Sequence, residues 1–207
     1  DKTGTLTTSK MTVVRIWAGG KVFEQAAAVA GAIKEQLATA SVVNTLFKTF
    51  LKPPPPGGKG FTYCGNDTEC ALLIMSNQLQ HPYEKVRDKY PDDMPGRKVF
   101  SFSSDRKRMT TIVTNPEGKA VAYCKGAAEI VAALCDKYVG EDGRETPITP
   151  QIKTQISQTI SDFANLGLRT LCIAQRTLPS DWQTACAVNG EISLSKIEES
   201  LVCVGLV

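Results

Sequence analysis

The sequence lacks several features that would assign a protein to a class at once. It contains a single histidine, His81, and its seven cysteines form no Cys-x-x-Cys pair, so the ligand spacing of a zinc site is absent. No stretch approaches the roughly 20 apolar residues that a membrane-spanning helix requires, and no signal-peptide pattern is found. The formal net charge of +3 is too small to indicate a nucleic-acid-binding surface or a polybasic membrane patch. We therefore expect a folded domain that does not enter a bilayer, with reduced and mostly buried cysteines.

The composition fits one well-cored domain with pieces of a neighbour. The chain has 207 residues, of which 42% are hydrophobic, and this is enough for a single core. It begins at Asp1 without an initiator methionine, and it stops on an apolar run, residues 201–207, that is typical of a buried strand. We interpret the chain as a fragment of a longer protein.

Several stretches have the spacing or the start signals of helices. Residues 24–50 carry apolar side chains at helical spacing, with an expected break near Thr39–Ser41. Asn66 precedes Glu69 by three positions, which is the pattern of a capping box and predicts a helix over about 68–79. The further predicted helices are 127–138 and one that starts at Pro150, with Thr149 as its N-cap, and ends at Gly167.

The remaining segments predict strands and loops. The predicted strands are 98–103, 109–114, 119–124 and 169–174, with a turn at 115–118. Residues 53–58, Pro-Pro-Pro-Pro-Gly-Gly, predict an exposed loop, because proline lacks an amide donor and glycine has no preferred backbone conformation. Together these elements predict an α/β fold, an antiparallel sheet flanked by helices.

The first seven residues, Asp-Lys-Thr-Gly-Thr-Leu-Thr, form the most specific motif. Asp1 stands where a strand would end, and the small residues after it would let a phosphate approach the backbone closely. Such a carboxylate is able to accept a phosphoryl group. Thr3 occupies the position of a potential second acid, so an acyl phosphate on Asp1 is expected to hydrolyse slowly. In the alternative interpretation, Asp1 only ends a strand and the threonines satisfy a turn.

This heptapeptide resembles, letter for letter, the phosphorylation signature of the P-type ATPases, members of the haloacid-dehalogenase-like superfamily. The resemblance implies ATP and Mg²⁺ as cofactors. It implies that Asp1 is the phosphoryl acceptor, that Thr3 belongs to the catalytic site, and that both contribute part of a Mg²⁺ site.

The segment 102–109, Phe-Ser-Ser-Asp-Arg-Lys-Arg-Met, places an aromatic ring before a basic cluster. A ring is able to stack on a base while an ammonium group reaches phosphates. The segment resembles one in the same pumps, which implies stacking by Phe102 and a charge contact by Lys107. Many relatives have arginine where this chain has Ser104, which leaves a phosphate contact by Arg106 or Arg108 open. The alternative for Phe102 is ordinary core packing beside Phe100.

Three other stretches resemble the nucleotide-binding domain of this family. Lys125-Gly126-Ala127 looks like its Lys-Gly-Ala motif, which implies that Lys125 and Gly126 lie at the pocket floor; a solvent-facing lysine is the alternative. The helix start at residues 65–72 implies that Glu69 binds the adenine amino group, although completing the capping box would also explain it. The stretch 168–174 implies that Arg169 approaches the phosphates and that Leu171 packs near adenine, with a surface charge as the alternative for Arg169.

The resemblance divides the chain into three parts. Residues 1–12 are expected to start a phosphorylation domain and a hinge, and residues 13–200 to form the nucleotide-binding domain. Residues 201–207 are expected to return towards the phosphorylation domain, so that the terminal strands belong to a haloacid-dehalogenase-like fold.

The expected function is to position Mg-ATP for phosphoryl transfer to Asp1 in a cation pump. Calcium is implied by the likeness of 65–73 and 168–174 to plasma-membrane-type calcium pumps. The implied partners are ATP and the phosphorylation, actuator and transmembrane domains of the same pump, with the domain monomeric on the cytosolic face of a plasma or calcium-store membrane. No Thr-Gly-Asp or Gly-Asp-Gly-x-Asn-Asp segment is present, so the chain alone is expected to bind ATP without turnover.

Three alternatives remain at this point. The pump would transport another cation, since ion ligands lie outside this chain. A phosphatase of the same superfamily would require an acid in place of Thr3 and further aspartates downstream. A degenerate interaction domain would have lost nucleotide binding.

Overall fold

The computed structural model describes residues 10–58 and 60–207, and within them nine strands form one sheet. Asp1 and Thr3 lie outside the described residues. The strands of the sheet are β1 (Ile16–Ala18), β2 (Lys21–Phe23), β5 (Lys98–Ser103), β6 (Arg108–Thr114), β7 (Ala120–Ala127), β8 (Cys135–Val139), β9 (Glu145–Pro147), β10 (Leu171–Thr177) and β13 (Leu201–Leu206). The main path runs β2-β1-β13-β10-β7-β6-β5, and β8 pairs with both β13 and β9. All pairs are antiparallel except β8 with β13, so the predicted α/β class with an antiparallel sheet is confirmed.

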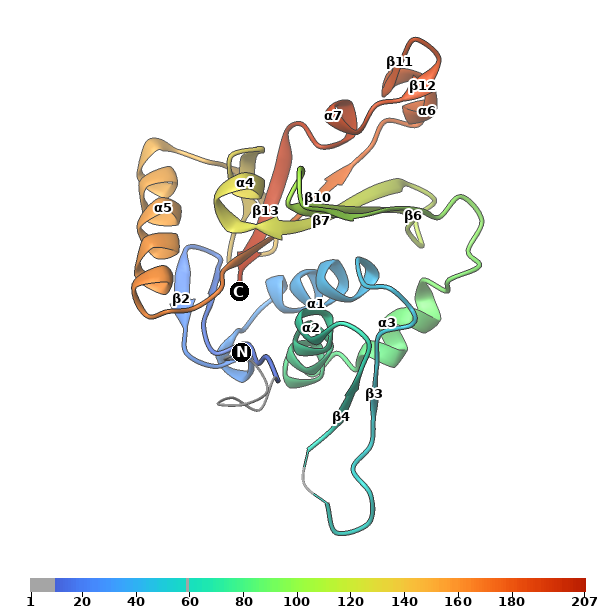
Figure 1. The fold of residues 1–207 in the computed structure, drawn as a ribbon. Coiled ribbons are helices and arrows are strands. Elements are labelled where there is room, and N and C mark those ends of the chain that lie inside the picture. Colours follow the sequence, from blue (N-terminus) through green and yellow to red (C-terminus); the bar gives the residue numbers. More distant parts are fainter. Residues whose placement is uncertain (1–9, 59) are drawn as a thin grey trace.

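Helices cover both faces of this sheet (Figure 1). On one face lie the 3₁₀ helix η1 (Ala26–Ala28), α1 (Ile33–Val43), α2 (Asp67–Gln78) and α3 (Tyr83–Lys89). On the other face lie α4 (Ala128–Ala132), α5 (Pro150–Asn165), α6 (Trp182–Ala185) and α7 (Leu194–Ile197). Two small hairpins lie outside the sheet: β3 (Phe50–Lys52) with β4 (Thr62–Cys64), and β11 (Ala187–Val188) with β12 (Glu191–Ile192). No helix of the described ranges is long and apolar enough to cross a membrane.

The side chains of the central strands alternate between the two faces of the sheet, and so they contribute to the hydrophobic clusters on both faces. On β6 and β7, Val113 and Tyr123 pack with α1, α2 and α3, whereas Ile112 and Ala122 pack with α6 and α7. Cys124 belongs to a third cluster, together with residues of α4 and α5. Strands that are buried on both faces consist of nearly continuous runs of apolar residues. The central strands accordingly carry few exposed side chains.

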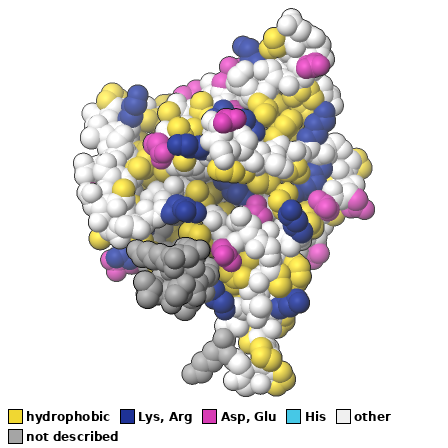
Figure 2. Space-filling view, viewed as in Figure 1, with side chains coloured by type: hydrophobic (Ala, Val, Ile, Leu, Met, Phe, Trp, Pro, Cys, Tyr) yellow, Lys and Arg dark blue, Asp and Glu magenta, His cyan; other side chains and the backbone are white. Residues whose placement is uncertain are grey.

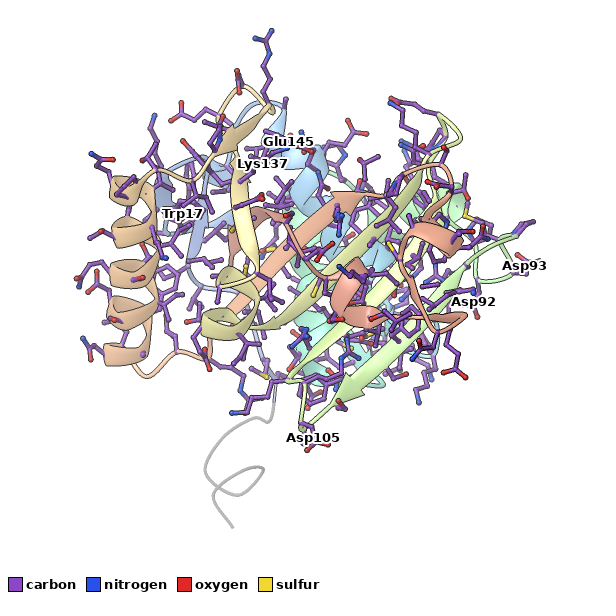
Figure 3. The ribbon with its side chains drawn as sticks, turned by 90° about the horizontal axis from the view of Figure 1, so that it is seen from above. Trp17, Asp92, Asp93, Asp105, Lys137 and Glu145 are labelled. Atoms are coloured by element: carbon purple, nitrogen blue, oxygen red, sulfur yellow. The ribbon has the colours of Figure 1, made fainter. Side chains whose placement is uncertain are left out.

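The far end of the sheet contains an aromatic contact between β1 and β8. The rings of Trp17 and Tyr138 lie 5.9 Å apart and are tilted by 45°. Beside them, Lys137 and Glu145 pair across β8 and β9, with Nζ and the carboxylate 3.2 Å apart. Figure 3 shows Trp17 near α5, and Lys137 and Glu145 at the upper edge of the molecule, opposite Asp105 on the β5–β6 turn.

The predicted ends of α5 are confirmed. Thr149 is the N-cap of this helix, because its hydroxyl accepts a hydrogen bond from Ile152 N, and Pro150 is the first helical residue. Gly167 follows the helix with φ +73, a left-handed conformation that glycine adopts without a steric penalty. The segments predicted as the strands 98–103, 109–114 and 119–124 are also confirmed within a few residues.

The prediction for residues 24–50 was wrong in part. Helix α1 runs without a break through Thr39–Ser41, because Ala38, Ala40 and Ser41 are small, fully buried and packed on the sheet. Phe50, predicted in that helical stretch, lies instead on strand β3.

The helix predicted over 127–138 is shorter than expected. Only Ala128–Ala132 are helical, and Cys135–Val139 form β8, because pairing with β13 overrides the helical spacing. Residues 125–127 likewise belong to β7 and precede α4, so the Lys-Gly-Ala motif ends a strand before the helix starts.

The expectation that 201–207 belong to a phosphorylation domain is not confirmed. Strand β13 lies inside the main sheet, with β10 on one side and β1 and β8 on the other. Every residue of Leu201–Leu206 is buried, because both faces of the strand are covered. The boundaries at residues 12 and 200 stay predictions.

Candidate functional site

A pocket of about 670 Å³ lies at the edge where β7 ends and α2 begins. Its walls come from the start of α2, the turn between β5 and β6, the end of β7 with α4, and the segment that joins α5 to β10. Figure 2 shows hydrophobic and basic side chains exposed together between the sheet and the α1–α2 layer. A pocket of this size lies within the range of about 300–1,000 Å³ that is usual for small-molecule sites.

Seven of the nine predicted site residues line this pocket. They come from four separate stretches of the chain: Glu69; Phe102 and Lys107; Lys125 and Gly126; Arg169 and Leu171. Ser104 lines it as well. The structure therefore brings together the residues that the sequence singled out, except for Asp1 and Thr3, which are not described.

Lys125 and Glu69 form a buried ion pair on the pocket floor. Nζ of Lys125 donates to Oε1 of Glu69 over 2.8 Å, and the two residues are only 7% and 5% exposed. Burial lowers the pKa of Lys125, and the neighbouring Glu69 carboxylate opposes this shift. The alternative of a solvent-facing lysine is therefore wrong.

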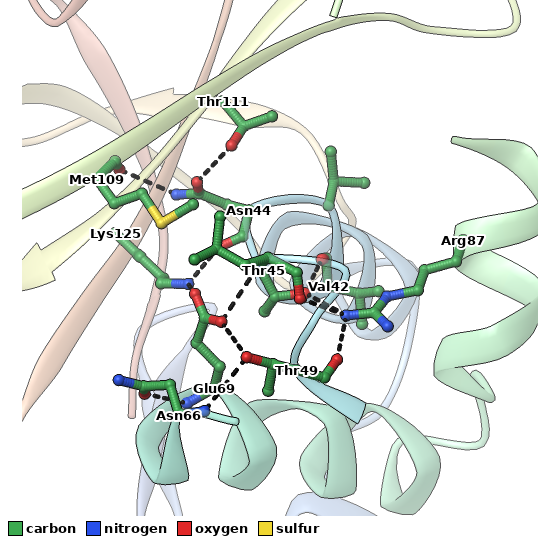
Figure 4. A network of polar contacts seen from close by, with 12 residues as sticks. Val42, Asn44, Thr45, Thr49, Asn66, Glu69, Arg87, Met109, Thr111 and Lys125 are labelled. Atoms are coloured by element: carbon green, nitrogen blue, oxygen red, sulfur yellow. Dashed lines mark hydrogen bonds and ion pairs between the residues drawn. The ribbon is translucent and has the colours of Figure 1, made fainter. Parts of the chain in front are cut away.

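The loop after α1 completes this network (Figure 4). Oε2 of Glu69 accepts from Leu46 N over 3.1 Å and from the Thr49 hydroxyl over 2.8 Å. Lys125 also donates to the carbonyl of Asn44. A carboxylate oxygen has two lone pairs, and Oε1 accepts from Lys125 alone among the described residues. One acceptor position of Glu69 thus remains for a donor group on a ligand.

Asn44 and Arg87 support the network from behind, and sequence reasoning missed both. Asn44 Nδ2 donates to Met109 O over 3.0 Å and its Oδ1 accepts from the Thr111 hydroxyl over 2.8 Å, so it joins the loop to β6. Arg87 Nη2 on α3 donates to Thr49 O over 2.8 Å. No local pattern marks these positions, since their partners are far away in the sequence.

The capping box at the start of α2 forms only in part. Asn66 Oδ1 accepts from Glu69 N over 3.0 Å, as predicted. The Glu69 side chain does not return this bond, because it is engaged with Lys125 and Thr49, and Asn66 N donates to the Thr49 hydroxyl instead. Helix capping therefore explains Asn66, and the pocket network explains the Glu69 carboxylate.

Phe102 is an exposed ring on the pocket wall. It is 60% exposed, whereas Phe100 is half-buried against the cluster that contains Ile112 and Trp182. The register of β5 on β6 shifts between Phe100 and Ser103, so the two rings have different surroundings. Core packing is therefore the wrong interpretation of Phe102, and its ring is available to a planar ligand.

Lys107 lies in the same turn with a left-handed backbone. Its φ of 51° is uncommon for a non-glycine residue and is unfavourable by about 1 kcal/mol. Lys107 N donates to Ser103 O over 2.7 Å, and Lys107 O accepts from Ala127 N over 3.0 Å. These two bonds hold an exposed ammonium group at the mouth of the pocket.

Gly126 is required by the close approach of this turn. A Cβ at Gly126 would lie 2.4 Å from Lys107 O and 2.5 Å from Arg108 Cβ. The absence of a side chain therefore lets β7 pack against the Lys107 turn. The family resemblance implied only that Gly126 lies at the pocket floor.

Arg169 and Leu171 border the pocket beside the end of α5. Arg169 is exposed and Leu171 is half-buried, and both also line an adjoining pocket of about 640 Å³ formed with residues 10–15. Leu168 and Thr170 are shared by the two pockets as well. This segment thus supplies one cation and two apolar side chains to the site.

Arg106 and Arg108 do not line the pocket. Both pair with Glu198, so the structure leaves Lys107 as the basic residue of the β5–β6 turn that is available to an anionic ligand. Within 10–58 and 60–207, no group of three or more histidine, cysteine, aspartate or glutamate residues is arranged to hold a metal ion. The Mg²⁺ ligands predicted at Asp1 and Thr3 lie outside the described residues.

The exposed ring of Phe102 and the exposed cations Lys107 and Arg169 around one pocket suit a planar, anionic ligand. A family model described as P-type ATPase, cytoplasmic domain N, matches residues 34–207. The chain belongs to the P-type ATPases.

Relatives with similar sequences include plasma membrane calcium-transporting ATPases. The chain is 37% identical to mca-1 of Caenorhabditis elegans over 190 residues, which cover 86% of this chain and 15% of the relative. It is 36% identical to ATPase 1 of Gallus gallus over 87% of this chain and 15% of the relative, and 33% identical to ATPase 3 of Rattus norvegicus over 93% and 16%. The chain thus spans about 15% of the length of these relatives.

Proposed function

We propose that this chain is the ATP-binding domain of a P-type calcium pump and holds Mg-ATP for phosphoryl transfer to Asp1. The observation that carries the proposal is the convergence of Glu69, Phe102, Lys107 and Lys125 on one pocket. Family membership and the similarity to calcium-transporting relatives support the pump and the ion. The intact pump would be an enzyme in a membrane, with this domain on the cytosolic side.

Each side of the pocket matches one part of ATP. The exposed ring of Phe102 offers a stacking surface for adenine, worth about 1–3 kcal/mol per base. The open acceptor position on Glu69 Oε1 suits the adenine amino group, and Leu171 supplies an apolar contact. Lys107 and Arg169 are exposed cations at the mouth, where a triphosphate would extend towards solvent.

Phosphoryl transfer depends mainly on positioning and on neutralising the charge of the phosphates. This domain would contribute base recognition and part of the charge neutralisation. Mg²⁺ bound with the triphosphate would neutralise further charge, and Asp1 would receive the phosphoryl group in the intact pump. We expect the isolated chain to bind ATP without turnover.

A titration of the purified chain with ATP, ADP and GTP, followed by amide chemical shifts, tests this function. ATP and ADP should produce saturable shifts at Glu69, Phe102, Lys107 and Lys125, and GTP should bind more weakly because it lacks the adenine amino group. The variant Arg144→Asn is a control for the loss of a surface charge outside the pocket. Arg144 is exposed and pairs only with Asp142 among the described residues, so this variant should bind ATP with the wild-type affinity. An absence of shifts at millimolar nucleotide would favour a degenerate interaction domain.

A further inference from the structure

Glu198 is a buried carboxylate on the sheet face opposite α1 and α2. It follows α7 and is 1% exposed. Its Oε2 accepts from Arg108 Nε over 2.7 Å, and its Oε1 accepts from Arg106 Nη2 and, over 2.5 Å, from the Thr110 hydroxyl. Three side chains from the β5–β6 turn and the start of β6 therefore converge on one acid that is distant in sequence.

Within the described residues, this cluster is not the only attachment of α7 to the sheet. The segment around α6 and α7 is anchored by an apolar cluster that includes Ile112, Trp182 and Ile197. A buried ion pair often contributes little net stability, since both charges lose their hydration. The cluster holds the two residues on either side of Lys107, which indicates a role beyond attachment.

The two arginines flank Lys107 in the chain, and Lys107 is the residue with the left-handed backbone. Glu198 holds both neighbours on one face of the sheet, while Lys107 lies on the pocket side. Arg108 Nη1 also donates to Arg106 O over 3.1 Å, which closes the turn around Lys107. Glu198, Arg106 and Arg108 thus form a clamp, which restrains the backbone from which the Lys107 ammonium extends.

We propose that Glu198 is a positioning residue for Lys107, and that through Arg106 and Arg108 it sets the affinity of the pocket for the phosphate end of its ligand. This inference rests on the proposed function. Glu198 makes no contact with the pocket, so its effect is confined to ligands that use Lys107. A nucleoside without phosphates contacts only the Phe102 and Glu69 side and is insensitive to the clamp.

The test compares ATP with adenosine on the variant Glu198→Gln, by calorimetry on the full 207-residue chain. The amide accepts at one oxygen only and presents a donor to an arginine, so the clamp loosens. We expect ATP affinity to fall by about tenfold, equivalent to roughly 1.4 kcal/mol, while adenosine affinity stays within about twofold. Equal losses for both ligands, or no loss for ATP, would overturn the inference.

The matched control is Glu199→Gln. Its side chain is 50% exposed and its carboxylate lies 3.9 Å from Arg176 and from Lys196, so the same chemical change is made at the surface. Both affinities should stay at the wild-type value.

A double variant tests whether the effect passes through Lys107. Lys107→Asn removes the ammonium, and asparagine tolerates a left-handed backbone. If Glu198 acts through Lys107, adding Glu198→Gln to Lys107→Asn leaves ATP affinity unchanged, and a further loss of ATP affinity contradicts the inference.

Arg106→Gln replaces Glu198→Gln if the latter fails to fold. The Arg106 side chain is 24% exposed, and its loss opens one arm of the clamp. The same selective loss of ATP affinity is expected. If the wild-type chain binds adenosine and ATP equally, or neither, the proposed function fails before any Glu198 variant is measured.

Discussion

The ammonium of Lys125 lies 2.8 Å from the carboxylate of Glu69, and this contact joins the last residues of β7 to the first turn of α2. Two residues that are distant in sequence thereby close the floor of the pocket. Both are almost completely buried, so neither can be removed without changing the stability of the domain as well as its ligand contacts. Variants of either residue therefore require a measurement of stability beside any measurement of ligand binding.

Lys125→Met should lower the free energy of unfolding, by about 3–5 kcal/mol, because it leaves the Glu69 carboxylate buried without its cation. The double variant Lys125→Met/Glu69→Gln should recover a large part of this loss, since no unpaired charge remains. Urea denaturation of the wild type, both single variants and the double variant measures the coupling. Additive effects of the two changes would contradict a coupled pair.

Phe102→Ala should weaken ATP binding by about 1–3 kcal/mol, through loss of stacking, with an unchanged melting temperature. The reason is that the ring is 60% exposed and contributes little to the core. Phe100→Ala is the matched control, because Phe100 packs on the cluster of α6 and α7. That change should reduce stability and spare ATP affinity in the remaining folded protein; the reverse pattern would disprove the assignment of the two rings.

Gly126→Ala should destabilise the domain by about 1–3 kcal/mol, the range of overpacking substitutions. Its Cβ would meet Lys107 O at 2.4 Å, so the turn must move away from β7. Gly118→Ala is a control for the loss of a glycine alone, because a Cβ there meets nothing within 4 Å, although its φ of +79 adds a backbone penalty. Thermal melting and the amide shift of Lys107 report the two effects; an unmoved Lys107 amide in Gly126→Ala would contradict the close approach.

Stability should fall as the pH rises above about 9. Burial raises the pKa of the Cys124 thiol from 9.0 to about 12, so the folded state retains a proton that the unfolded state loses. The contribution is complete below the unfolded pKa and decreases by about 1.4 kcal/mol per pH unit until the folded pKa is reached. Burial also raises the pKa of Tyr123, which acts in the same direction, whereas the lowered pKa of Lys125 acts in the opposite one.

Urea titrations between about pH 8 and about pH 11 measure this slope. The variant Cys124→Ala should have a lower stability at neutral pH and a shallower alkaline slope. A slope equal to that of the wild type would exclude Cys124 as its source.

Local patterns in the sequence determined the elements whose signals are contained within a few residues. Thr149 and Pro150 mark the start of α5, and the alternation and turn of residues 98–124 define three consecutive strands, because capping and hairpin pairing use near neighbours. The motif residues Phe102, Lys107, Lys125 and Glu69 were also identified from the sequence, by resemblance to a family.

Only the tertiary structure decided what those residues contact. The helical spacing over 127–138 was overridden by pairing of β8 with β13. Leu201–Leu206 became a central strand because it pairs with β10 on one side and with β1 and β8 on the other. Asn44, Arg87 and Glu198 have no local signature, since each acts through partners 38 or more positions away. A sequence pattern specifies which groups a segment offers, whereas burial and long-range hydrogen bonds decide which of them face one another.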